Sequence, residues 1–550
     1  MSVSDRVMGR NGTFLSPIFL NHIQNLRARA GKVAIRVGGN SQEQATMIPA
    51  WAPLEGPTIN KTANPVQVPG FTSSPLLTIS EDLIYAMSNI SALVGVEWYF
   101  GLPFLNEQEI PTIIEDVTSI LGTNLLGFQM ANEPDIYESH GKKPAPYQIP
   151  EYMADWERVR STYAADRTDL IAPNVCCSWT IDELLTAGFL TQFAPHLHSV
   201  SVQHYKDNAC ANALIPMPPQ DAFLTYQTHS SAQNFWNPYV NASQIISAAG
   251  KDFIMLETNT ASCGGFAGAS DSYAAGLYLI DLALQGASIG MSQILLHNGG
   301  VGQAYNLFTP PPNNQSTFRQ WTTTPPYYSA LIMSEVMEED GSQVMDLLLG
   351  GNSTHTPGYA IYKSGTPIKL ALFNYITDPS GANDAQFNFP STQPSVRVKY
   401  FSSATGSTAD KFNLTWAGQT MGDQFGSDGR LQGEEQTQTV QCNAGTCTVT
   451  VKAPQFALVF LDNQDTIDPG LSTQTWATSV ATKLGGTAVV DPSILATSNG
   501  RGGAQEAFNV GGTSSGSQVY ASGAQRQVFL SGALAGVVAM VVGAWAVLAR

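Results

Sequence analysis

Two glutamates in this sequence stand directly after apolar segments that are typical of buried strands. Residues Leu125–Met130 are followed by Ala131-Asn132-Glu133-Pro134-Asp135, and residues Phe253–Leu256 are followed by Glu257-Thr258-Asn259. Carboxylates at the ends of different strands of one parallel barrel can point into the same mouth. Such a pair can hydrolyse a glycosidic bond: one carboxylic acid protonates the leaving oxygen, and the other carboxylate attacks the anomeric carbon or activates a water molecule.

The alternative for each glutamate is a structural carboxylate that a neighbouring arginine satisfies. For an isolated glutamate at a strand end, this alternative is at least as good as a catalytic role. The Asn132-Glu133-Pro134 sequence after an apolar strand, together with a second strand-end glutamate at Glu257, favours the catalytic interpretation.

Strand-like and helix-like segments alternate over the first part of the chain, which indicates a βα-repeat. The predicted helices are Ser16–Ala30, Ile110–Leu121, Tyr152–Ala165 and Asp271–Ala287. The predicted strands are Val33–Val37, Val94–Phe100, Leu125–Met130, Leu170–Ala172, Val200–Gln203, Phe253–Leu256 and Gln293–Leu296. These are seven strands, whereas a closed (β/α)8 TIM barrel has eight. The strand that is not found is most simply the first.

From about Gln343 the pattern changes to short strands separated by turns, with no helix between them. These strands are predicted at Val344–Leu349, Tyr359–Tyr362, Lys369–Asn374, Arg397–Phe401, Thr446–Lys452 and Gln455–Leu461. The chain is therefore predicted to hold an α/β catalytic barrel at 1–340 and an all-β sandwich domain at 341–463. A Ser/Thr/Gly-rich linker is predicted at 464–527 and a hydrophobic anchor segment at 528–549.

The C-terminal segment Val528–Ala549 is a 22-residue, almost wholly apolar run that Arg550 closes. It is long enough to cross a bilayer. The small-residue cluster Gly511–Gly516, a polar spacer and the apolar tail match a GPI-type lipid-anchor signal, and a spanning transmembrane helix is the alternative. We therefore expect attachment through the C-terminus to the extracellular face of the plasma membrane or to the cell wall.

The N-terminal residues Met1–Asn11 are polar and contain no apolar signal-peptide core. A tail that requires export needs an export signal, and the strand count is one short. We therefore expect the natural protein to begin upstream of Met1, with a signal peptide and the first barrel strand.

The composition fits a secreted glycoprotein and excludes nucleic acid as a partner. Charged residues make up only 13% of the chain and the net charge is −17, whereas nucleic acid requires a basic surface. There is neither a His-Glu-x-x-His motif nor a phosphate-binding glycine loop, so no metal or nucleotide cofactor is expected. N-linked glycans are predicted at Asn11, Asn60, Asn89, Asn241, Asn314, Asn352 and Asn413.

The six cysteines show no paired zinc-ligand spacing. Two disulfides are predicted: Cys442–Cys447 across a short turn, and Cys210–Cys263, whose members each follow a predicted barrel strand and could meet on one face. For the adjacent Cys176-Cys177, buried free thiols are the simplest interpretation.

Several segments resemble glycoside hydrolase family 79, which contains β-glucuronidases and heparanase-like enzymes. Asn132-Glu133-Pro134 resembles the acid/base motif of the large clan of retaining (β/α)8 glycosidases. Ala34–Gln42 (AIRVGGNSQ) resembles the early strand of the family, Phe253–Gly265 (FIMLETNTASCGG) resembles its nucleophile segment in fungal members, and Pro325–Ala330 (PPYYSA) also fits. The likeness covers about residues 1–463, including the family's C-terminal β-domain.

The resemblance implies a retaining, β-glucuronidase-like glycoside hydrolase that acts on cell-wall or extracellular glycans by a two-carboxylate double displacement. Glu133 would be the acid/base and Glu257 the nucleophile. Asn132 would contact the sugar 2-hydroxyl, and Tyr205, beside His204 at the end of the fifth predicted strand, would hydrogen-bond the nucleophile.

Other residues are placed near the predicted mouth by position alone. Arg36 could orient Glu257 and lower its pKa by opposite charge. His297 could line the mouth, and a core histidine is an equal alternative. Backbone N–H groups of Asn298–Gly302, with Tyr305, could bind the carboxylate of a glucuronide.

Two further interpretations compete with this one. Gly286-Ala287-Ser288-Ile289-Gly290 matches the G-x-S-x-G esterase pattern, but a helix precedes it and a strand follows, the reverse of what that motif requires. The second is a catalytically inactive, surface-anchored carbohydrate-binding or structural protein on the same scaffold. Such a protein would be expected to have lost a carboxylate, and both carboxylates are present.

Overall fold

The computed structural model describes residues 6–50, 58–62, 75–210, 216–300, 302–310, 321–339, 341–462 and 474–478. The predicted anchor segment and nearly all of the predicted linker lie outside these ranges. Within them, no helix combines the length and the apolar character that crossing a membrane requires.

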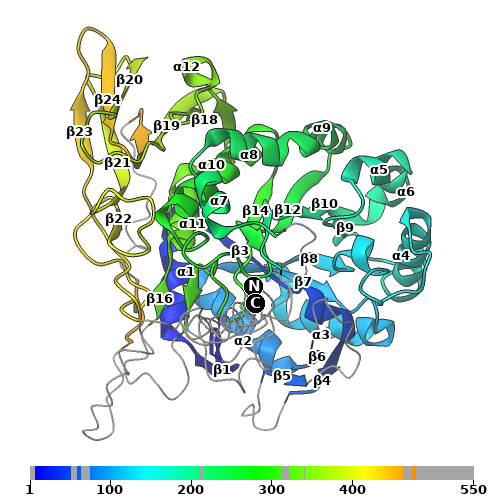
Figure 1. Ribbon diagram of the computed structural model, residues 1–550. Helices are drawn as coiled ribbons and strands as arrows, with labels where there is room; N and C mark the ends of the chain where they lie inside the picture. The colour runs from blue at the N-terminus through cyan, green and yellow to red at the C-terminus, as the bar shows by residue number, and fades with distance from the viewer. Residues whose placement is uncertain are drawn as a thin grey trace, which may run out of the picture.

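The first part of the chain forms a near-closed parallel barrel of seven described strands (Figure 1). The sheet order is β14-β12-β10-β9-β8-β7-β3, so each strand pairs with the next barrel strand along the chain. This order is expected when each connection is a right-handed crossover. The strands are β3 (Val33–Val37), β7 (Val96–Leu102), β8 (Leu125–Met130), β9 (Leu170–Val175), β10 (Leu197–Gln203), β12 (Asp252–Thr258) and β14 (Gln293–Leu296).

The helices surround this barrel, and local signals in the sequence set several of their ends. The Ser16 hydroxyl caps α1 by accepting the N–H of Phe19, and Pro17 opens the helix. Helix α2 runs to Val94 because Gly95 adopts the left-handed conformation that ends it. The predicted strand Val94–Phe100 therefore begins later, at Val96. The helices are α1 (Pro17–Ala30), α2 (Glu81–Val94), α3 (Ile110–Leu121), α4 (Ile149–Tyr163), α5 (Ile181–Thr186), α6 (Phe189–Phe193), α7 (Pro219–Thr225), α8 (His229–Trp236), α9 (Val240–Ala248), α10 (Tyr273–Ser288), α11 (Pro325–Val336) and α12 (Leu349–Asn352).

The second part is an antiparallel β-domain that stands on one side of the barrel, in yellow and orange in Figure 1. Its main sheet has the order β17-β18-β19-β25-β21-β22, with β23 also pairing with β21, and β20 pairs separately with β24. Apolar side chains of β19, β21, β24 and β25 share one core. The strands are β17 (Gln343–Asp346), β18 (Gly358–Lys363), β19 (Thr366–Asn374), β20 (Ala385–Pro390), β21 (Ser395–Ser403), β22 (Leu414–Trp416), β23 (Gln438–Gln441), β24 (Thr446–Val451) and β25 (Gln455–Phe460). The predicted α/β barrel followed by an all-β domain is confirmed.

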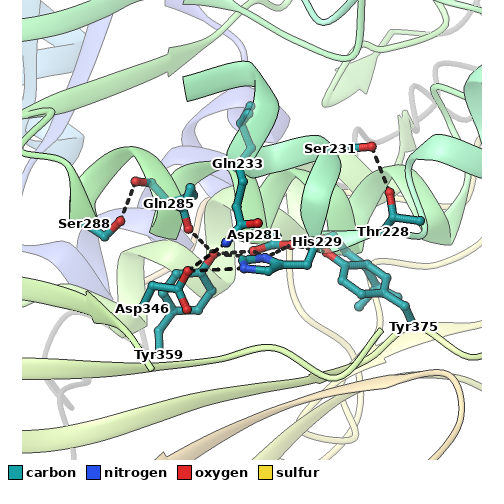
Figure 2. Close-up of polar contacts among 12 residues, drawn as sticks. Thr228, His229, Ser231, Gln233, Asp281, Gln285, Ser288, Asp346, Tyr359 and Tyr375 are labelled. Carbon is teal, nitrogen blue, oxygen red and sulfur yellow. Dashed lines mark hydrogen bonds and ion pairs between the residues drawn. The ribbon is translucent and has the colours of Figure 1, made fainter. Parts of the chain in front are cut away.

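A buried polar cluster, the His229 cluster, joins the two domains (Figure 2). His229 on α8 lies with Nδ1 3.0 Å from Asp281 of α10 and Nε2 3.3 Å from Asp346 of β17. The hydroxyls of Tyr359 and Tyr375 donate to Asp281. Burial opposes a charged imidazole, but the hydrogen bonds that its ring donates to the two aspartates raise the pKa of His229 to about 9. The ring is therefore an imidazolium that pairs carboxylates from both domains.

A second cluster of buried charges, centred on Glu335, strengthens the contact between the barrel and the β-domain. Glu335 of α11 is fully buried and lies 3.2 Å from Arg29 of α1. From the β-domain, Lys399 lies 2.5 Å from the same carboxylate and the Trp416 indole N–H donates to it at 2.9 Å. Because Glu335 pairs with Arg29 of the barrel and with Lys399 of the β-domain, the ion cluster joins the two domains.

All six cysteines lie in described residues, and each is paired. The structure joins Cys210 to Cys263 with their Cα atoms 5.0 Å apart, and Cys442 to Cys447 with a Cα separation of 4.1 Å. It also joins the adjacent Cys176-Cys177, which the sequence had suggested to be free thiols.

Candidate active site

Glu133 and Glu257 both lie at the carboxyl end of the barrel, where parallel-barrel enzymes carry their active sites. Glu257 is the sixth residue of β12 and is 3% exposed. Glu133 follows β8 in the turn that leads to Pro134 and is partly exposed. Arg36 of β3 connects the two strand ends, because its guanidinium donates to Glu257 and, at 2.6 Å, to the side-chain oxygen of Asn132.

The carboxylate of Glu257 is held on both of its oxygens. One oxygen accepts from Arg36, and the other accepts from the Tyr205 hydroxyl at 2.7 Å. His297 lies 3.5 Å from the second oxygen and 2.8 Å from the Tyr205 hydroxyl. The structure therefore brings Arg36, Tyr205 and His297 to Glu257.

These partners keep Glu257 ionised in spite of its burial. Burial on its own would raise the pKa of Glu257, but His297, Arg36 and the Tyr205 hydroxyl outweigh it and bring that pKa to about 2. Burial lowers the pKa of His297 to about 4, so this ring is neutral at neutral pH. Arg36 then supplies the positive charge beside the carboxylate.

Glu133 has the opposite protonation state. Burial and the negative charge of Glu257 raise the pKa of Glu133 to about 8, although Lys142 and Arg36 lower it in part. At neutral pH the site therefore holds one protonated acid and one carboxylate. Two carboxyl groups whose pKa values are pushed apart in this way can serve as a general acid and a nucleophile.

The turn that carries Glu133 has an unusual backbone. Ala131 has φ 63° and Glu133 has φ 53°, both in the left-handed region that residues other than glycine rarely adopt. The Ala131 carbonyl accepts from the side chains of Gln129 and Asn174, each at 3.0 Å, and the Glu133 N–H donates to the Asn174 carbonyl at 3.2 Å. Conformations of this kind cluster at active sites, where surrounding groups hold them.

Asn132 directly precedes Glu133, and its side-chain oxygen is already occupied. It accepts from Arg36, from Gln203 at 3.0 Å and from Gln129 at 3.2 Å. Its amide nitrogen lies 3.4 Å from the Asn40 side chain. The contact of Asn132 with a sugar hydroxyl stays a prediction.

The structure does not bring every predicted residue to the carboxylates. The His204 ring lies 3.0 Å from the Tyr239 hydroxyl and stacks on Phe235 at 4.6 Å, and His204 reaches Glu257 only through a backbone hydrogen bond of 3.0 Å to its carbonyl. The Tyr305 hydroxyl lies 2.8 Å from His297 and thus belongs to the nucleophile's network. The Gly299 N–H, one of the proposed anion donors, donates to the Asn306 side chain at 2.7 Å.

The sequence reasoning missed several polar side chains that support the site. Asn174 near the end of β9 could have been found by the same test of strand-end residues, had that strand not been predicted to stop at Ala172. Gln129 lies inside a strand, Glu43 lies in a short 3-10 helix and Lys142 lies in a loop. No short-range signal in the sequence places these three beside Glu133.

The serine-hydrolase alternative has no support in the geometry. Helix α10 ends at Ser288, and its hydroxyl donates to the carbonyl of Gln285 one turn earlier. Among the described residues, no group of three or more histidine, cysteine, aspartate or glutamate side chains could hold a metal ion.

An apolar cavity of about 410 Å³ lies between the two edge strands of the barrel, β3 and β14. It reaches Arg36, Glu257 and His297 from the side of helices α1, α10 and α11. The barrel sheet is near-closed but not continuous beside this cavity, because β3 and β14 are not joined by strand hydrogen bonds.

Comparison with known proteins matches the β-domain to a family model and a longer part of the chain to a relative. Residues 358–458 match the glycosyl hydrolase family 79 C-terminal beta domain. A β-glucuronidase of Aspergillus niger is 22% identical over 395 residues, which are 68% of this chain and 69% of that protein.

Two solved structures share the fold. A 4-O-α-L-rhamnosyl-β-D-glucuronidase of Fusarium oxysporum 12S, solved as its Rha-GlcA complex, has a TM-score of 0.64 and 20% identity, with 81% of this chain and 92% of that chain covered. A GH51 arabinofuranosidase of Xanthomonas axonopodis pv. citri has a TM-score of 0.51 and 12% identity, with 84% and 97% covered. The resemblance that the motifs suggested is therefore confirmed.

Proposed function

The chain is a glycoside hydrolase with the C-terminal β-domain of family 79, and from this premise we propose that it is a retaining β-glucuronidase. The observation that carries the proposal is the pair of opposite protonation states at one mouth. The pKa of Glu133 is raised to about 8 and that of Glu257 is lowered to about 2. An acid and a nucleophile in this arrangement are what a double displacement requires.

In the first step, the Glu257 carboxylate attacks the anomeric carbon while Glu133 gives its proton to the leaving oxygen. The glycosidic C–O bond breaks and an ester bond to Glu257 forms. In the second step, the now ionised Glu133 takes a proton from a water molecule, whose oxygen attacks the anomeric carbon and releases Glu257. Both carboxyl groups return to their starting protonation states.

The retaining course has a geometric and a stereochemical test. Retaining glycosidases have carboxyl groups about 5–5.5 Å apart, whereas inverting ones leave about 6.5–9.5 Å for a water molecule. We expect the shorter separation between Glu133 and Glu257 in a crystal structure. We also expect the β-anomer as the first sugar product in a time-resolved NMR spectrum, and first release of the α-anomer would refute retention.

The preference for β-D-glucuronides is supported by the relatives. The Aspergillus niger protein is a β-glucuronidase, and the Fusarium oxysporum structure is that of a rhamnosyl-glucuronidase. In this chain, Tyr305 and the backbone of the turn at 298–302 remain candidates for the sugar carboxylate, although the Gly299 N–H has a protein acceptor. A panel of 4-nitrophenyl β-glycosides tests the proposal, and equal or better turnover of the glucoside than of the glucuronide would refute it.

An inactive carbohydrate-binding protein is the alternative from another class. Both carboxylates, the arginine between them and the tyrosine on the nucleophile are in place, and this arrangement favours catalysis. Binding of an oligosaccharide without turnover by the purified protein would favour the alternative.

The proposed location is the cell exterior, with attachment through the C-terminal segment 528–549. Of the predicted glycan sites, Asn11 is buried, 5% exposed, and Asn314 lies outside the described residues. The exposed ones are Asn60, Asn89, Asn241, Asn352 and Asn413. Release from cells by a phosphoinositide-specific phospholipase would support a lipid anchor, and an intact 528–549 peptide in the mature protein would indicate a spanning helix.

A further inference from the structure

Glu43 is a buried acid beside the active site that the double displacement does not use. It lies in the short 3-10 helix Asn40–Gln44 after β3 and is 2% exposed. Its backbone carbonyl accepts from the N–H of Leu105 at 3.0 Å, which fixes it to the loop after β7. Its carboxylate accepts the backbone N–H of Asn132 at 2.5 Å. The contact therefore reaches the residue that directly precedes the acid/base.

This contact completes the support of the left-handed turn. Side chains of Gln129 and Asn174 hold the Ala131 carbonyl, and the Asn174 carbonyl holds the Glu133 N–H. A further backbone group of the turn is the Asn132 N–H, which donates to the Glu43 carboxylate. The Tyr137 hydroxyl lies 3.2 Å from the same N–H. A turn with two non-glycine residues at positive φ persists only when its surroundings hold it.

The charges around Glu43 come from several elements. Lys142 lies in the loop after β8, Arg36 lies on β3, and the Tyr137 hydroxyl faces the carboxyl group. Burial raises the pKa of Glu43 to about 7, while Lys142, Tyr137, the Asn132 N–H and Arg36 lower it in part. An ionised acceptor binds a backbone N–H more tightly than a neutral one does.

We propose that Glu43 is a positioning residue that fixes the Ala131–Glu133 turn, so that the Glu133 carboxyl group lies where it can protonate the leaving oxygen. The inference rests on the assignment of Glu133 as the acid/base. A displacement of about 1 Å at a reacting group can cost on the order of 10²-fold in rate. Glu43 itself makes no contact with the reacting atoms in this account.

The test compares two leaving groups on the same enzyme sample. Phenyl β-D-glucuronide has a poor leaving group that needs a proton from Glu133, and 4-nitrophenyl β-D-glucuronide has a good one that needs it much less. We expect Glu43→Leu to lower kcat/KM, which reports cleavage of the glycosidic bond, about 10²-fold for the phenyl substrate. The kcat/KM of the nitrophenyl substrate should fall far less, because its leaving group departs with little help from the Glu133 proton. Glu43→Gln keeps an acceptor oxygen and should restore most of the rate.

Glu109→Leu is a matched control. The Glu109 carboxylate accepts the N–H of Met47 at 3.0 Å, so it makes the same kind of bond in a neighbouring segment, away from the catalytic turn. We expect this variant to lower both substrates equally or not at all. Because both rates are measured on one sample, a smaller folded fraction cannot change their ratio.

The outcomes distinguish a failure of the positioning role of Glu43 from a failure of the acid/base assignment of Glu133. A Glu43→Leu enzyme that loses both substrates equally would overturn the positioning role. If that variant does not fold, Tyr137→Phe takes its place, with a several-fold larger loss expected for the phenyl substrate and an equal loss as the contrary result. If Glu133→Ala itself shows no leaving-group dependence, the assignment of the acid/base fails instead.

Discussion

Two buried charge clusters in this chain differ in how completely their carboxyl groups are paired. In the His229 cluster between the domains, Asp281 and Asp346 both accept hydrogen bonds from the imidazolium. In the active site Glu257 is equally well held, but among the described residues no group is seen to donate a hydrogen bond to the carboxyl group of Glu133. Complete pairing fixes structure, whereas an acid that lies beside a negative charge and accepts no hydrogen bond stays protonated and is available to a substrate.

The comparison also shows how burial acts on the two clusters. In the His229 cluster, the hydrogen bonds to the two aspartates outweigh burial, so the imidazole is charged. In the active site Arg36 and its neighbours ionise Glu257, and that charge then helps to keep Glu133 neutral. The same physical terms produce a static ion cluster in one place and an acid with a nucleophile in the other.

The largest expected effect comes from removing the ionised member of the active-site pair. Glu257→Gln should lower kcat by on the order of 10⁴-fold or more, because no covalent intermediate can form. The amide can keep hydrogen bonds to the Arg36 and Tyr205 side chains, so the Tm should change little. Steady-state kinetics and thermal unfolding check both points, and retained activity would contradict the nucleophile's role.

A substitution in the His229 cluster between the domains should have the opposite effect: it should lower the stability and leave kcat nearly unchanged. His229→Ala leaves Asp281 and Asp346 without their imidazolium, and breaking one partner out of a buried ion cluster costs about 3–5 kcal/mol. Denaturant unfolding should show this loss, while kcat of the folded enzyme stays near the wild-type value. A large fall in kcat with unchanged stability would show that the two clusters do not divide structure and function in this way.

The pH dependence of stability should report His229. Its folded pKa of about 9 lies above its ordinary value of 6.5. A raised pKa stabilises the fold fully below the ordinary value, and this contribution is lost as the pH rises through the folded value. We therefore expect the Tm to fall between pH 6.5 and 9, and the fall to be smaller in His229→Gln. Identical Tm profiles for the two proteins would contradict this prediction.

The smallest effect is expected from Lys142, whose positive charge lowers the pKa of Glu133. Lys142→Met removes that charge, so Glu133 should stay protonated to higher pH. The basic limb of the kcat/KM profile should then move upward by up to roughly one pH unit. Lys143→Met is the control, because Lys143 pairs with Asp155 at 2.7 Å. A shift in the opposite direction would sink the electrostatic assignment.

The strand-end test on the sequence identified both glutamates, and it placed Tyr205 next to the nucleophile. It succeeded because apolar strands buried on both faces are visible as uninterrupted runs, and the polar residues after them meet at one edge of the barrel. The same test suggested His204, which the structure places against Phe235 and Tyr239. Neighbouring side chains at a strand end point in different directions, and this decides whether His204 or Tyr205 faces the mouth. The sequence does not show which of the two it is.

Long-range contacts explain what the sequence could not predict. Glu43 meets Asn132 across 89 positions of the chain, and His229 meets Asp346 across 117. No local sequence pattern predicts either contact. The strands β20 and β23 were also missed, because they are partly exposed and contain Gln, Asn or Thr, and β22 was missed because it has only three residues. Their pairing with β24 and β21 supplies the order that their own sequences do not indicate.

The central claim is that Glu257 forms a covalent bond to the sugar while Glu133 supplies the proton. Treatment with 2-deoxy-2-fluoro-β-D-glucuronyl fluoride, followed by proteolysis and mass spectrometry, tests it most directly, because the fluorine slows hydrolysis of the intermediate. The account predicts one fluoroglucuronyl group on the peptide that contains Glu257, and none in Glu257→Gln. A label on Glu133 or on another residue, or turnover of the reagent without any labelled protein, would contradict it.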